Sequence, residues 1–408
     1  MSNNTKSIFG IAVIVAALGY FVDIYDLLLF SIIRMPSLES LGLSPDQVKS
    51  EGEKILMWQM VGLLIGGIIW GMMGDKKGRL SVLFGSILLY SLANIANGFI
   101  QEVDQYKWVR FIAGLGLAGE LGAGITLVSE MVAKESRGIA TSLVAGIGLT
   151  GAIIAFVMKQ NFDWRTCYFI GGGMGLLLLL LRVSVFESGM YHQLTQTSVQ
   201  RGNFLLLFTN RDRLKRYLLN VLIGLPTWLV IGVLITFSNE FGMQMGIKEK
   251  IDPGKAVMYA YVFISIGDIG IGFISQWLRS RKKAMYIFYA ITILFIVLFF
   301  TAQMNGSANG MYIICAGLGL GTGFWAIFVT MAAEQFGTNL RATATTTIPN
   351  MVRGMLAIVI LPLFKGLRNF TTYYDAGWIT AVIIMSISLV AVVYIKETFG
   401  NDLDFIEE

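Results

Sequence analysis

The sequence predicts an all-α membrane protein in which twelve transmembrane helices form two pseudo-symmetric six-helix bundles. The first observation is composition: the 408-residue chain is 55% hydrophobic and 14% charged, with a mean hydropathy of +0.68. Soluble domains average about 25% charged residues. The second observation is that apolar runs of about 20 residues, long enough to cross a bilayer as a helix, recur along nearly the whole chain. The third is an internal repeat at half the chain length.

The apolar runs fall into two sets of six, separated by the longest polar interruption between them. We expect an N-terminal bundle over residues 1–186, a cytoplasmic linker over 187–213, and a C-terminal bundle with a short cytoplasmic tail over 214–408. The individual helices are expected at residues 8–34, 55–74, 80–100, 106–132, 138–159, 165–186, 214–240, 254–278, 284–303, 309–336, 342–367 and 372–396.

The basic residues set the expected orientation of these helices. They cluster in short loops, and the positive-inside rule places both termini in the cytoplasm. The same rule accounts for the net charge of +5, so a nucleic-acid partner is not indicated. The N-terminus leads into an apolar run without a small-residue cleavage site, which argues against a cleaved signal peptide. We therefore expect a multi-pass protein of a cell membrane, with a bacterial inner membrane favoured.

An internal repeat supports the division into two bundles. The segment AGLGL at residues 113–117 recurs at 316–320, and Glu130 and Arg137 recur as Glu334 and Arg341. The displacement is close to half the chain length, so the repeated helices are the fourth and the tenth. Parallel six-helix repeats about an axis normal to the membrane are a known transporter architecture, in which two halves rock around a central site.

The loop after the second expected helix reads GMMGDKKGRL, residues 71–80. It resembles the signature G-x-x-x-D-(R/K)-x-G-(R/K) of the major facilitator superfamily, with matches at Gly71, Asp75, Lys76, Gly78 and Arg79. Four further stretches resemble the branch that holds sugar porters, metabolite–proton symporters and organic-ion transporters: RFIAGLGLAGELGAGITLVSEMVAKESRG (110–138), FES (186–188), AEQFGTNLRATA (333–344) and KETFGNDLDFIEE (396–408). The resemblance covers most of the chain and implies the major facilitator fold and a transport function.

This sequence departs from the family pattern at three positions, one of which is Ile24, where the helix-one motif of proton-coupled sugar porters has glycine. In the loop of the second half that corresponds to residues 71–80, Gln276 stands where the family often has aspartate. In the C-terminal motif, Lys396 stands where proline is usual in sugar porters. The departure at Gln276 argues against a fully symmetric gate.

The loop at residues 71–80 predicts a cytoplasmic gate, whose contacts break when the two halves rock. Asp75 ends a helix and is expected to meet the positive N-terminus of a neighbouring helix, while the basic residues beside it pair with Glu130 or with lipid phosphates. The alternative is that the basic residues only determine topology. The gate residues we predict are Gly71, Asp75, Lys76, Gly78, Arg79, Glu130, Arg137, Glu334 and Arg341.

Two aspartates interrupt the first apolar helix, although a carboxylate at the centre of a membrane span costs roughly 2.5–3.5 kcal/mol. Asp23 and Asp26 are three residues apart and share one helix face. Counting at about 1.5 Å per residue places Asp26 about 27 Å from the cytoplasmic end, level with Arg110 on the antiparallel fourth helix. A similar helix-one aspartate and helix-four arginine pair in proton-coupled sugar porters. The resemblance therefore implies a proton-coupling role for Asp26 and Arg110, and the buried acids Asp23 and Glu120 are further candidates for proton coupling.

Alternatives to this coupling role remain open at the sequence level. The Asp26–Arg110 pair can be a static contact that orders two helices, and Asp23 can be the proton carrier instead of Asp26. Glu120 and Asp268 both lie near mid-membrane. Three roles remain open for each of them: contact with substrate, proton transfer, or a polar contact that holds helices together.

A buried arginine in the second half points to an anionic partner. Arg353 lies between two prolines, and its partner is Asp268, Glu334 or the substrate; a substrate partner implies a carboxylate or phosphate. The expected substrate-binding residues are Arg353, Asp268, Gln59, Trp58, Trp228, Tyr261, Trp325 and Asn350.

We therefore predict a monomeric, proton-coupled symporter that imports a small polar metabolite, either an organic acid or a sugar-like solute. An organic-cation or drug/proton antiporter and an uncoupled facilitator are the alternatives. The single histidine, His192, and two distant cysteines indicate no metal site, no disulfide framework and no cofactor. Neither a catalytic Ser-His-Asp set nor a phosphate-binding glycine loop is present, so the sequence indicates no enzyme, and a sensor would be expected to add a signalling domain.

Overall fold

The computed structural model describes residues 10–133, 136–182, 202–302 and 306–407. Within these ranges the chain forms helices and no strands. Twelve helical spans are long and apolar enough to cross a membrane: Val13–Ser40, Lys54–Lys77, Arg79–Asn97, Val103–Met131, Arg137–Asn161, Trp164–Leu181, Arg211–Ile235, Pro253–Trp277, Arg281–Thr301, Ala308–Gln335, Arg341–Leu367 and Tyr373–Tyr394. The predicted all-α membrane fold is confirmed.

Several of these spans consist of more than one helix. The N-terminal half contains α1 (Ile11–Ser40), α2 (Pro45–Lys77), α3 (Arg79–Asn97), α4 (Val103–Leu117), α5 (Glu120–Met131), α6 (Arg137–Leu149), α7 (Gly151–Asn161) and α8 (Trp164–Arg182). The C-terminal half contains α10 (Leu206–Thr209), α11 (Arg211–Leu229), the π-helical η2 (Val230–Ile235), α12 (Ser238–Gln244), α13 (Pro253–Trp277), α14 (Arg281–Thr301), α15 (Ala308–Thr322), α16 (Trp325–Gln335), α17 (Arg341–Met355), the π-helical η3 (Leu356–Ile360), α18 (Leu361–Leu367) and α19 (Tyr373–Tyr394).

Local sequence signals fix the ends of these helices. The helix α2 begins with a capping box in which the Gln47 side chain accepts from the Ser44 main-chain N–H. It ends at Gly78, whose φ of 99° is a conformation that favours glycine. The side chain of Asp252 caps α13, which then begins with a proline. The capping and turn residues thus separate spans that share the same apolar composition.

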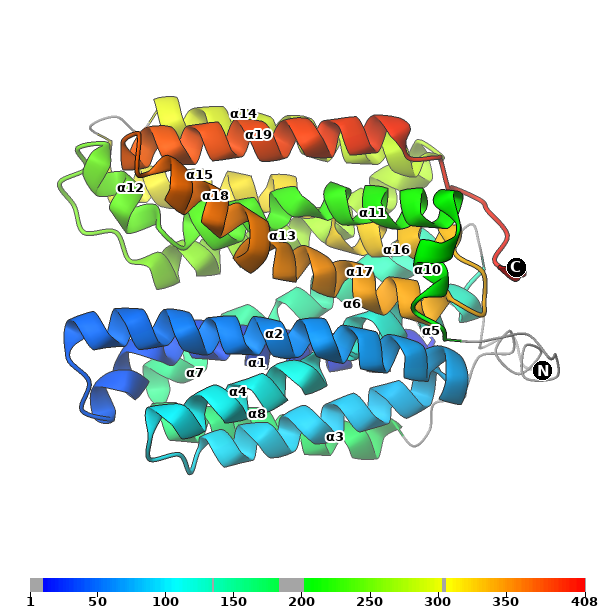
Figure 1. Cartoon of the computed structure of the whole chain (residues 1–408), viewed down its shortest axis with the longest axis horizontal. Helices are drawn as coiled ribbons and strands as arrows, with labels where there is room; N and C mark the ends of the chain where they lie inside the picture. Colours follow the sequence, from blue (N-terminus) through cyan, green and yellow to red (C-terminus); the bar gives the residue numbers. More distant parts are fainter. Residues whose placement is uncertain (1–9, 134–135, 183–201, 303–305, 408) are drawn as a thin grey trace.

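The two halves form two bundles that lie side by side along the long axis (Figure 1). The contacts between them are mainly those of α2 with α17 and of α6 with α13. Small residues allow this approach: a Cβ at Gly71 of α2 would lie 3.0 Å from the Cα of Thr343 on α17. The interface between the bundles therefore runs through the centre of the molecule.

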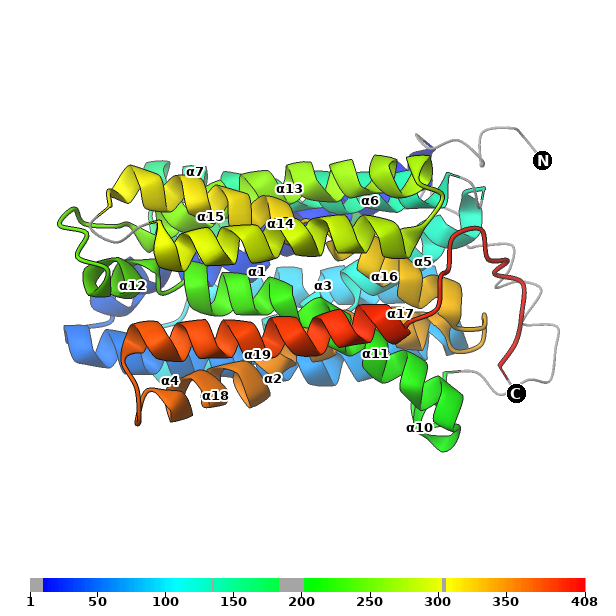
Figure 2. The ribbon, with the colours of Figure 1, turned by 90° about the horizontal axis from the view of Figure 1, so that it is seen from above.

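The two ends of the molecule differ in chemistry. The start of α1 and the described C-terminal tail lie at the same end (Figures 1 and 2), together with Arg79, Glu130, Arg137, Glu334 and Arg341, and we call it the charged end. The opposite end, which carries the α1–α2 and α18–α19 connections, is called the far end.

The structure corrects some of the expected helix bounds. The first span continues to Ser40, and α2 begins at Pro45, ten residues earlier than expected. At the far end both helices continue through polar residues beyond the apolar run that crosses the membrane, because helical hydrogen bonding does not require apolar side chains. The seventh span begins at Arg211, whereas residue 214 is expected. Residues 187–201 of the expected linker and the whole FES motif at 186–188 lie outside the described residues.

Candidate functional site

Two buried charges on different helices of the N-terminal half form an ion pair. The Arg110 Nη1 on α4 donates to Oδ1 of Asp26 on α1 at 2.9 Å, and its Nη2 donates to the Asp26 carbonyl at 3.2 Å. Both side chains are fully buried. This is the pairing that depth counting along the two antiparallel helices predicts, and each charge offsets the burial cost of the other.

Polar side chains that the sequence analysis does not single out surround this pair. The Nη1 of Arg110 also lies 3.4 Å from Oδ1 of Asn94, and its guanidinium stands 5.6 Å from the ring centroid of Tyr168. The Tyr168 hydroxyl is 2.8 Å from that of Tyr106, which donates to the Ser37 hydroxyl at 3.3 Å. Tyr106 lies one turn before Arg110 on α4, and this spacing was the sequence feature that could have placed Tyr106 near the ion pair.

A second group of polar residues lies between the two bundles, and we call Tyr20, Asp23, Tyr261, Trp325, Asn350 and Arg353 the central cluster. Arg353, Asp23 and Asp268 all lie near the buried Tyr20, and Arg353 also lies near the buried Tyr261. The Arg353 guanidinium lies 5.8 Å from the Trp325 ring centroid and donates to Asn350 Oδ1 at 3.3 Å. Residues from α1, α13, α16 and α17 therefore meet at one place.

Arg353 has no carboxylate partner in the described part of the chain. Of the two protein partners expected, Glu334 pairs with Arg137 and Arg281 at the charged end. Asp268 accepts a hydrogen bond from the Ala326 main-chain N–H at 2.9 Å. Arg353 is 3% exposed, and its Nε has no hydrogen-bond partner. Neither of the two protein partners expected from the sequence forms an ion pair with Arg353 in this structure.

Asp268 has a structural contact at a break in the tenth span. The helix α15 ends at Thr322 and α16 begins at Trp325. The carboxylate of Asp268 on α13 binds the first turn of α16, where main-chain N–H groups lack intrahelical partners. Its Oδ2 is buried without a hydrogen bond in the described structure. Glu120 occupies a similar position, because it is the buried first residue of α5, after the break in the fourth span.

The remaining predicted substrate residues differ in their surroundings. Gln59 is buried and donates to the Leu27 carbonyl at 3.3 Å, while its Oε1 lacks a partner within the described ranges. Trp228 is buried on α11. Trp58 packs against Trp108 with ring centroids 4.9 Å apart, and Trp108 is 56% exposed. The structure therefore does not bring Trp58 into the central cluster.

At the charged end, Glu130 joins the two halves. Its carboxylate accepts from Arg79 Nη2 at 2.8 Å within the N-terminal half and from Arg341 Nη1 at 2.8 Å across the interface. All three side chains are buried. The Glu130 carboxylate is therefore shared by two guanidinium groups, one from each half.

Glu334 repeats this arrangement in the C-terminal half. It accepts from Arg281 Nη2 at 3.0 Å within its own half and from Arg137 Nη1 at 3.2 Å across the interface. The predicted gate set omits Arg281, although its place after the eighth span corresponds to that of Arg79 after the second. We call the six residues Arg79, Glu130, Arg137, Arg281, Glu334 and Arg341 the charged network.

Asp75 binds the N-terminus of α17, as expected for a carboxylate facing a helix start. Its Oδ1 accepts from the Ala342 N–H at 3.0 Å, and its Oδ2 accepts from the Thr343 N–H at 2.9 Å and hydroxyl at 2.7 Å. Because Asp75 is on α2 and α17 is in the other half, these bonds close the charged end. Gln276 occupies the related position in the second half, so only one such carboxylate contact is available.

The C-terminal tail runs across the charged end (Figure 2), where it contacts the charged network. The Asn401 carbonyl accepts from Arg137 at 3.3 Å, and the Leu403 carbonyl accepts from Arg341. The Glu407 carboxylate accepts from Nη1 and Nη2 of Arg216 at 2.8 and 3.0 Å. The tail thus contacts arginines of both halves.

Comparisons with known proteins agree with this architecture. The family model of the Major Facilitator Superfamily matches residues 9–362. The niacin transporter NiaP of Acinetobacter baylyi is 24% identical, over 96% of this chain and 95% of that protein. The 3-(3-hydroxy-phenyl)propionate transporter of Escherichia coli is 26% identical, over 75% of each protein.

A solved structure shares the fold. The proton:xylose symporter XylE, bound to 6-bromo-6-deoxy-D-glucose, superposes with a TM-score of 0.75 over 98% of each chain, at 16% identity. The family match covers most of the chain, and the two-bundle arrangement of twelve spans accompanies it. The protein is therefore a multi-pass membrane transporter and not an enzyme, and the chain belongs to the major facilitator superfamily.

Proposed function

We propose that this protein imports a small organic acid across a bacterial inner membrane by proton symport, as a monomer, with alternating access to a site at the central cluster. The observation that carries the substrate class is the buried Arg353, which has no ion-pair partner among the described residues. A buried guanidinium without a counter-ion is costly, and a bound carboxylate would offset that cost with charge-assisted hydrogen bonds.

The aromatic residues around Arg353 favour an acid that carries a ring. Trp325 lies over the guanidinium and its Nε1 has no hydrogen-bond partner within the described ranges, while Tyr20 and Tyr261 add two further rings. Both relatives compared above are named for the transport of ring-bearing carboxylic acids, niacin and 3-(3-hydroxy-phenyl)propionate. A sugar-like solute would leave the Arg353 charge without a counter-ion.

Uptake into proteoliposomes tests the substrate class. We expect the purified protein to take up labelled nicotinate or 3-(3-hydroxyphenyl)propionate, and Arg353→Gln to weaken substrate binding roughly 10- to 100-fold, the value of a lost charged hydrogen bond. Arg353→Lys should retain part of the activity because it keeps the charge. Uptake of xylose or of an organic cation in place of both acids would contradict the proposal.

The Asp26–Arg110 pair supports proton coupling. Protonation of Asp26 removes the charge that holds Arg110, and the contact between α1 and α4 then weakens. The polar side chains around Arg110 offer it replacement partners during this step. A proton bound on one side and released on the other would link the movement of the halves to the proton gradient.

Substitution of Asp26 tests the coupling role. We expect Asp26→Asn to abolish accumulation driven by a pH gradient while leaving exchange of internal for external substrate, because the neutral side chain mimics the protonated state. The control is Asp104→Asn, which removes an exposed carboxylate. Unchanged proton-driven accumulation by Asp26→Asn would contradict the coupling role. The Asp26–Arg110 pair would then be a static contact, and Asp23 would be the next candidate for the proton carrier.

We also propose that the charged end faces the cytoplasm. The basic loops that support this orientation include the one at residues 76–79, and both described ends of the chain lie there. The charged network and the Asp75 contact with α17 then act as a cytoplasmic gate, closed in this structure. Import requires these bonds across the interface to break.

A further inference from the structure

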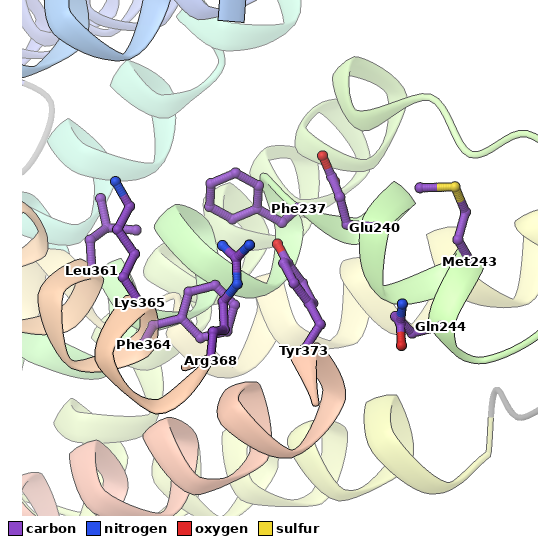
Figure 3. A pocket seen from close by; sticks show the side chains of 9 residues that line it. All are labelled: Phe237, Glu240, Met243, Gln244, Leu361, Phe364, Lys365, Arg368 and Tyr373. Carbon is purple, nitrogen blue, oxygen red and sulfur yellow. The ribbon is translucent and has the colours of Figure 1, made fainter. Parts of the chain in front are cut away.

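A cavity at the far end of the C-terminal half is separate from the central cluster. It has a volume of about 240 Å³ and lies where α12, α18 and α19 meet (Figures 1 and 3). We call it the outer cavity. Its lining consists of Phe237, Glu240, Met243, Gln244, Leu361, Phe364, Lys365, Arg368 and Tyr373. Pockets for drug-sized ligands occupy roughly 300–1,000 Å³, so this volume suits a compact ligand.

The outer cavity combines a fixed cation with aromatic walls. The Arg368 guanidinium stands 4.7 Å from the ring centroid of Tyr373 and 5.6 Å from that of Phe364. In Figure 3 the guanidinium and the Tyr373 hydroxyl point the same way, toward Phe237. Stacking on two rings holds an arginine in place while leaving its N–H groups available for a planar anion. Lys365, one turn earlier on α18, adds a second positive charge to the lining.

Two opposite charges of the outer cavity do not pair with each other. Arg368 forms no ion pair within the described ranges, and Glu240, on the facing helix α12, likewise forms none. Oε2 of Glu240 has no hydrogen-bond partner among the described residues. A compact ligand with a carboxylate at one end and a hydroxyl or N–H donor at the other would satisfy both groups, and a ring between them would fill the aromatic part.

One helical span reaches from the central cluster to the outer cavity. Arg353 lies on α17, and Arg368 directly follows α18, the last helix of the span that runs through α17, η3 and α18. Fifteen residues separate them, which corresponds to about 22 Å along a helix at 1.5 Å per residue. The two arginines are too far apart to bind one small molecule together, so each can hold its own carboxylate.

We infer that the outer cavity is a capture site for the transported acid, a small ring-bearing carboxylate with a hydroxyl or N–H donor, before the acid reaches the central cluster. This inference rests on the proposed import of organic acids and on the far end facing outward. An anion held by Arg368 and Lys365 at the entrance raises the local concentration of substrate next to the path inward. The capture site therefore affects how efficiently substrate enters and not how fast the halves rock.

The stoichiometry of 3-(3-hydroxyphenyl)propionate binding tests this inference, because this acid has a ring, a carboxylate and a hydroxyl donor. We expect the full-length protein in phosphatidylcholine nanodiscs to bind two molecules of the labelled acid, and Arg368→Gln and Arg353→Gln to bind one each. The matched control is Lys248→Gln, which removes an exposed positive charge from the same end of the same half, outside the outer cavity. It should still bind two. Arg368→Lys should retain the second molecule with weaker affinity, because the charge remains without the planar stack.

Transport kinetics provide a second readout that a merely structural role would not produce. We expect Arg368→Gln to raise the KM for 3-(3-hydroxyphenyl)propionate uptake about tenfold, the factor that 1.4 kcal/mol of lost binding produces, with Vmax unchanged. Glu240→Gln should change the preference among acids, weakening those with a donor opposite the carboxylate more than benzoate, which has none.

The outcomes separate this inference from the proposed function. One bound molecule in the wild type, lost in Arg353→Gln and retained in Arg368→Gln, overturns the capture site and leaves organic-acid import intact. An effect of Arg368→Gln that appears only with phosphatidylglycerol in the nanodisc also overturns it, because the cavity then holds a lipid phosphate. If the wild type neither binds nor transports any acid, both proposals fail.

Discussion

At the scale of single residues, the burial of charge organises this molecule. Asp26 with Arg110, and Glu130 with Arg79 and Arg341, are fully or almost fully buried ion pairs. Such pairs add little net stability, but removing one partner costs about 3–5 kcal/mol because a charge is left buried and uncompensated. Substitutions at these positions should therefore change which conformation is populated rather than leave the structure unaffected.

Glu130→Gln should open the charged end. The substitution leaves the buried Arg79 and Arg341 without their shared carboxylate. Because an uncompensated buried charge is unfavourable, a conformation in which water reaches the charged end becomes more populated. The measurement is alkylation of a single cysteine placed at Thr126, which lies at the interface with its Oγ1 2.6 Å from that of Thr345, in a chain whose Cys167 and Cys315 are serine. We expect several-fold faster labelling.

The control for this measurement is Glu39→Gln, which neutralises an exposed glutamate near the far end. It should label at the rate of the unsubstituted protein. Equal labelling of Glu130→Gln and Glu39→Gln would show that the charged network does not hold the end closed.

At the scale of elements, short polar contacts tie helix ends to distant segments. Glu397, at the start of the tail, accepts hydrogen bonds from the hydroxyl of Ser280, which caps α14, and from the Arg281 N–H in the first turn of that helix. It also accepts from the Thr398 and Phe399 N–H groups. The tail is thereby fixed at the beginning of α14 and continues over the charged network.

These bonds predict a pH dependence of tail docking. Partial burial acts to raise the pKa of Glu397, but the hydrogen bonds from Ser280 and the main-chain N–H groups outweigh it and lower the pKa below the usual value of 4.5. A lowered pKa means that the ionised form is favoured in the folded state. The stabilisation is therefore present above about pH 4.5 and disappears as the pH falls through the lowered pKa.

Limited proteolysis of the purified protein measures this effect. We expect the tail to resist cleavage at pH 7 and to become susceptible with an acid-stable protease below the pKa of Glu397. Glu397→Gln should be susceptible at both pH values, and the two proteins should converge in acid. A pH-independent difference between them would exclude the charge of Glu397 as the cause.

At the scale of the whole molecule, the interface between the bundles decides whether the halves stay together. The α2–α17 and α6–α13 contacts, the charged network and the Asp75 bonds all cross it. These contacts do not require the connection between the halves to be continuous. The bundle boundaries proposed from the sequence, 1–186 and 214–408, are therefore open to a direct test.

Two co-expressed fragments, residues 1–192 and 193–408, should copurify and transport substrate. The interface contacts drive assembly of helices that have already inserted into the membrane. As a control, a cut between residues 118 and 119, within the fourth span, should abolish activity because it divides a membrane helix. Failure of the first pair to associate would mean that the predicted linker is needed to hold the bundles.

The sequence by itself determined the number of spans, the division into halves, the family resemblance and the Asp26–Arg110 pairing, because hydropathy, repeat spacing and helical rise are local or one-dimensional quantities. It also predicted that Asp75 meets a helix N-terminus. Only the tertiary structure decided that Glu334 binds Arg281 and Arg137 and not Arg353, and that Trp58 packs against Trp108, outside the central cluster. Which of several buried charges become partners depends on how the helices are rotated and packed, and helix packing between distant segments is not encoded in the spacing of residues along one helix.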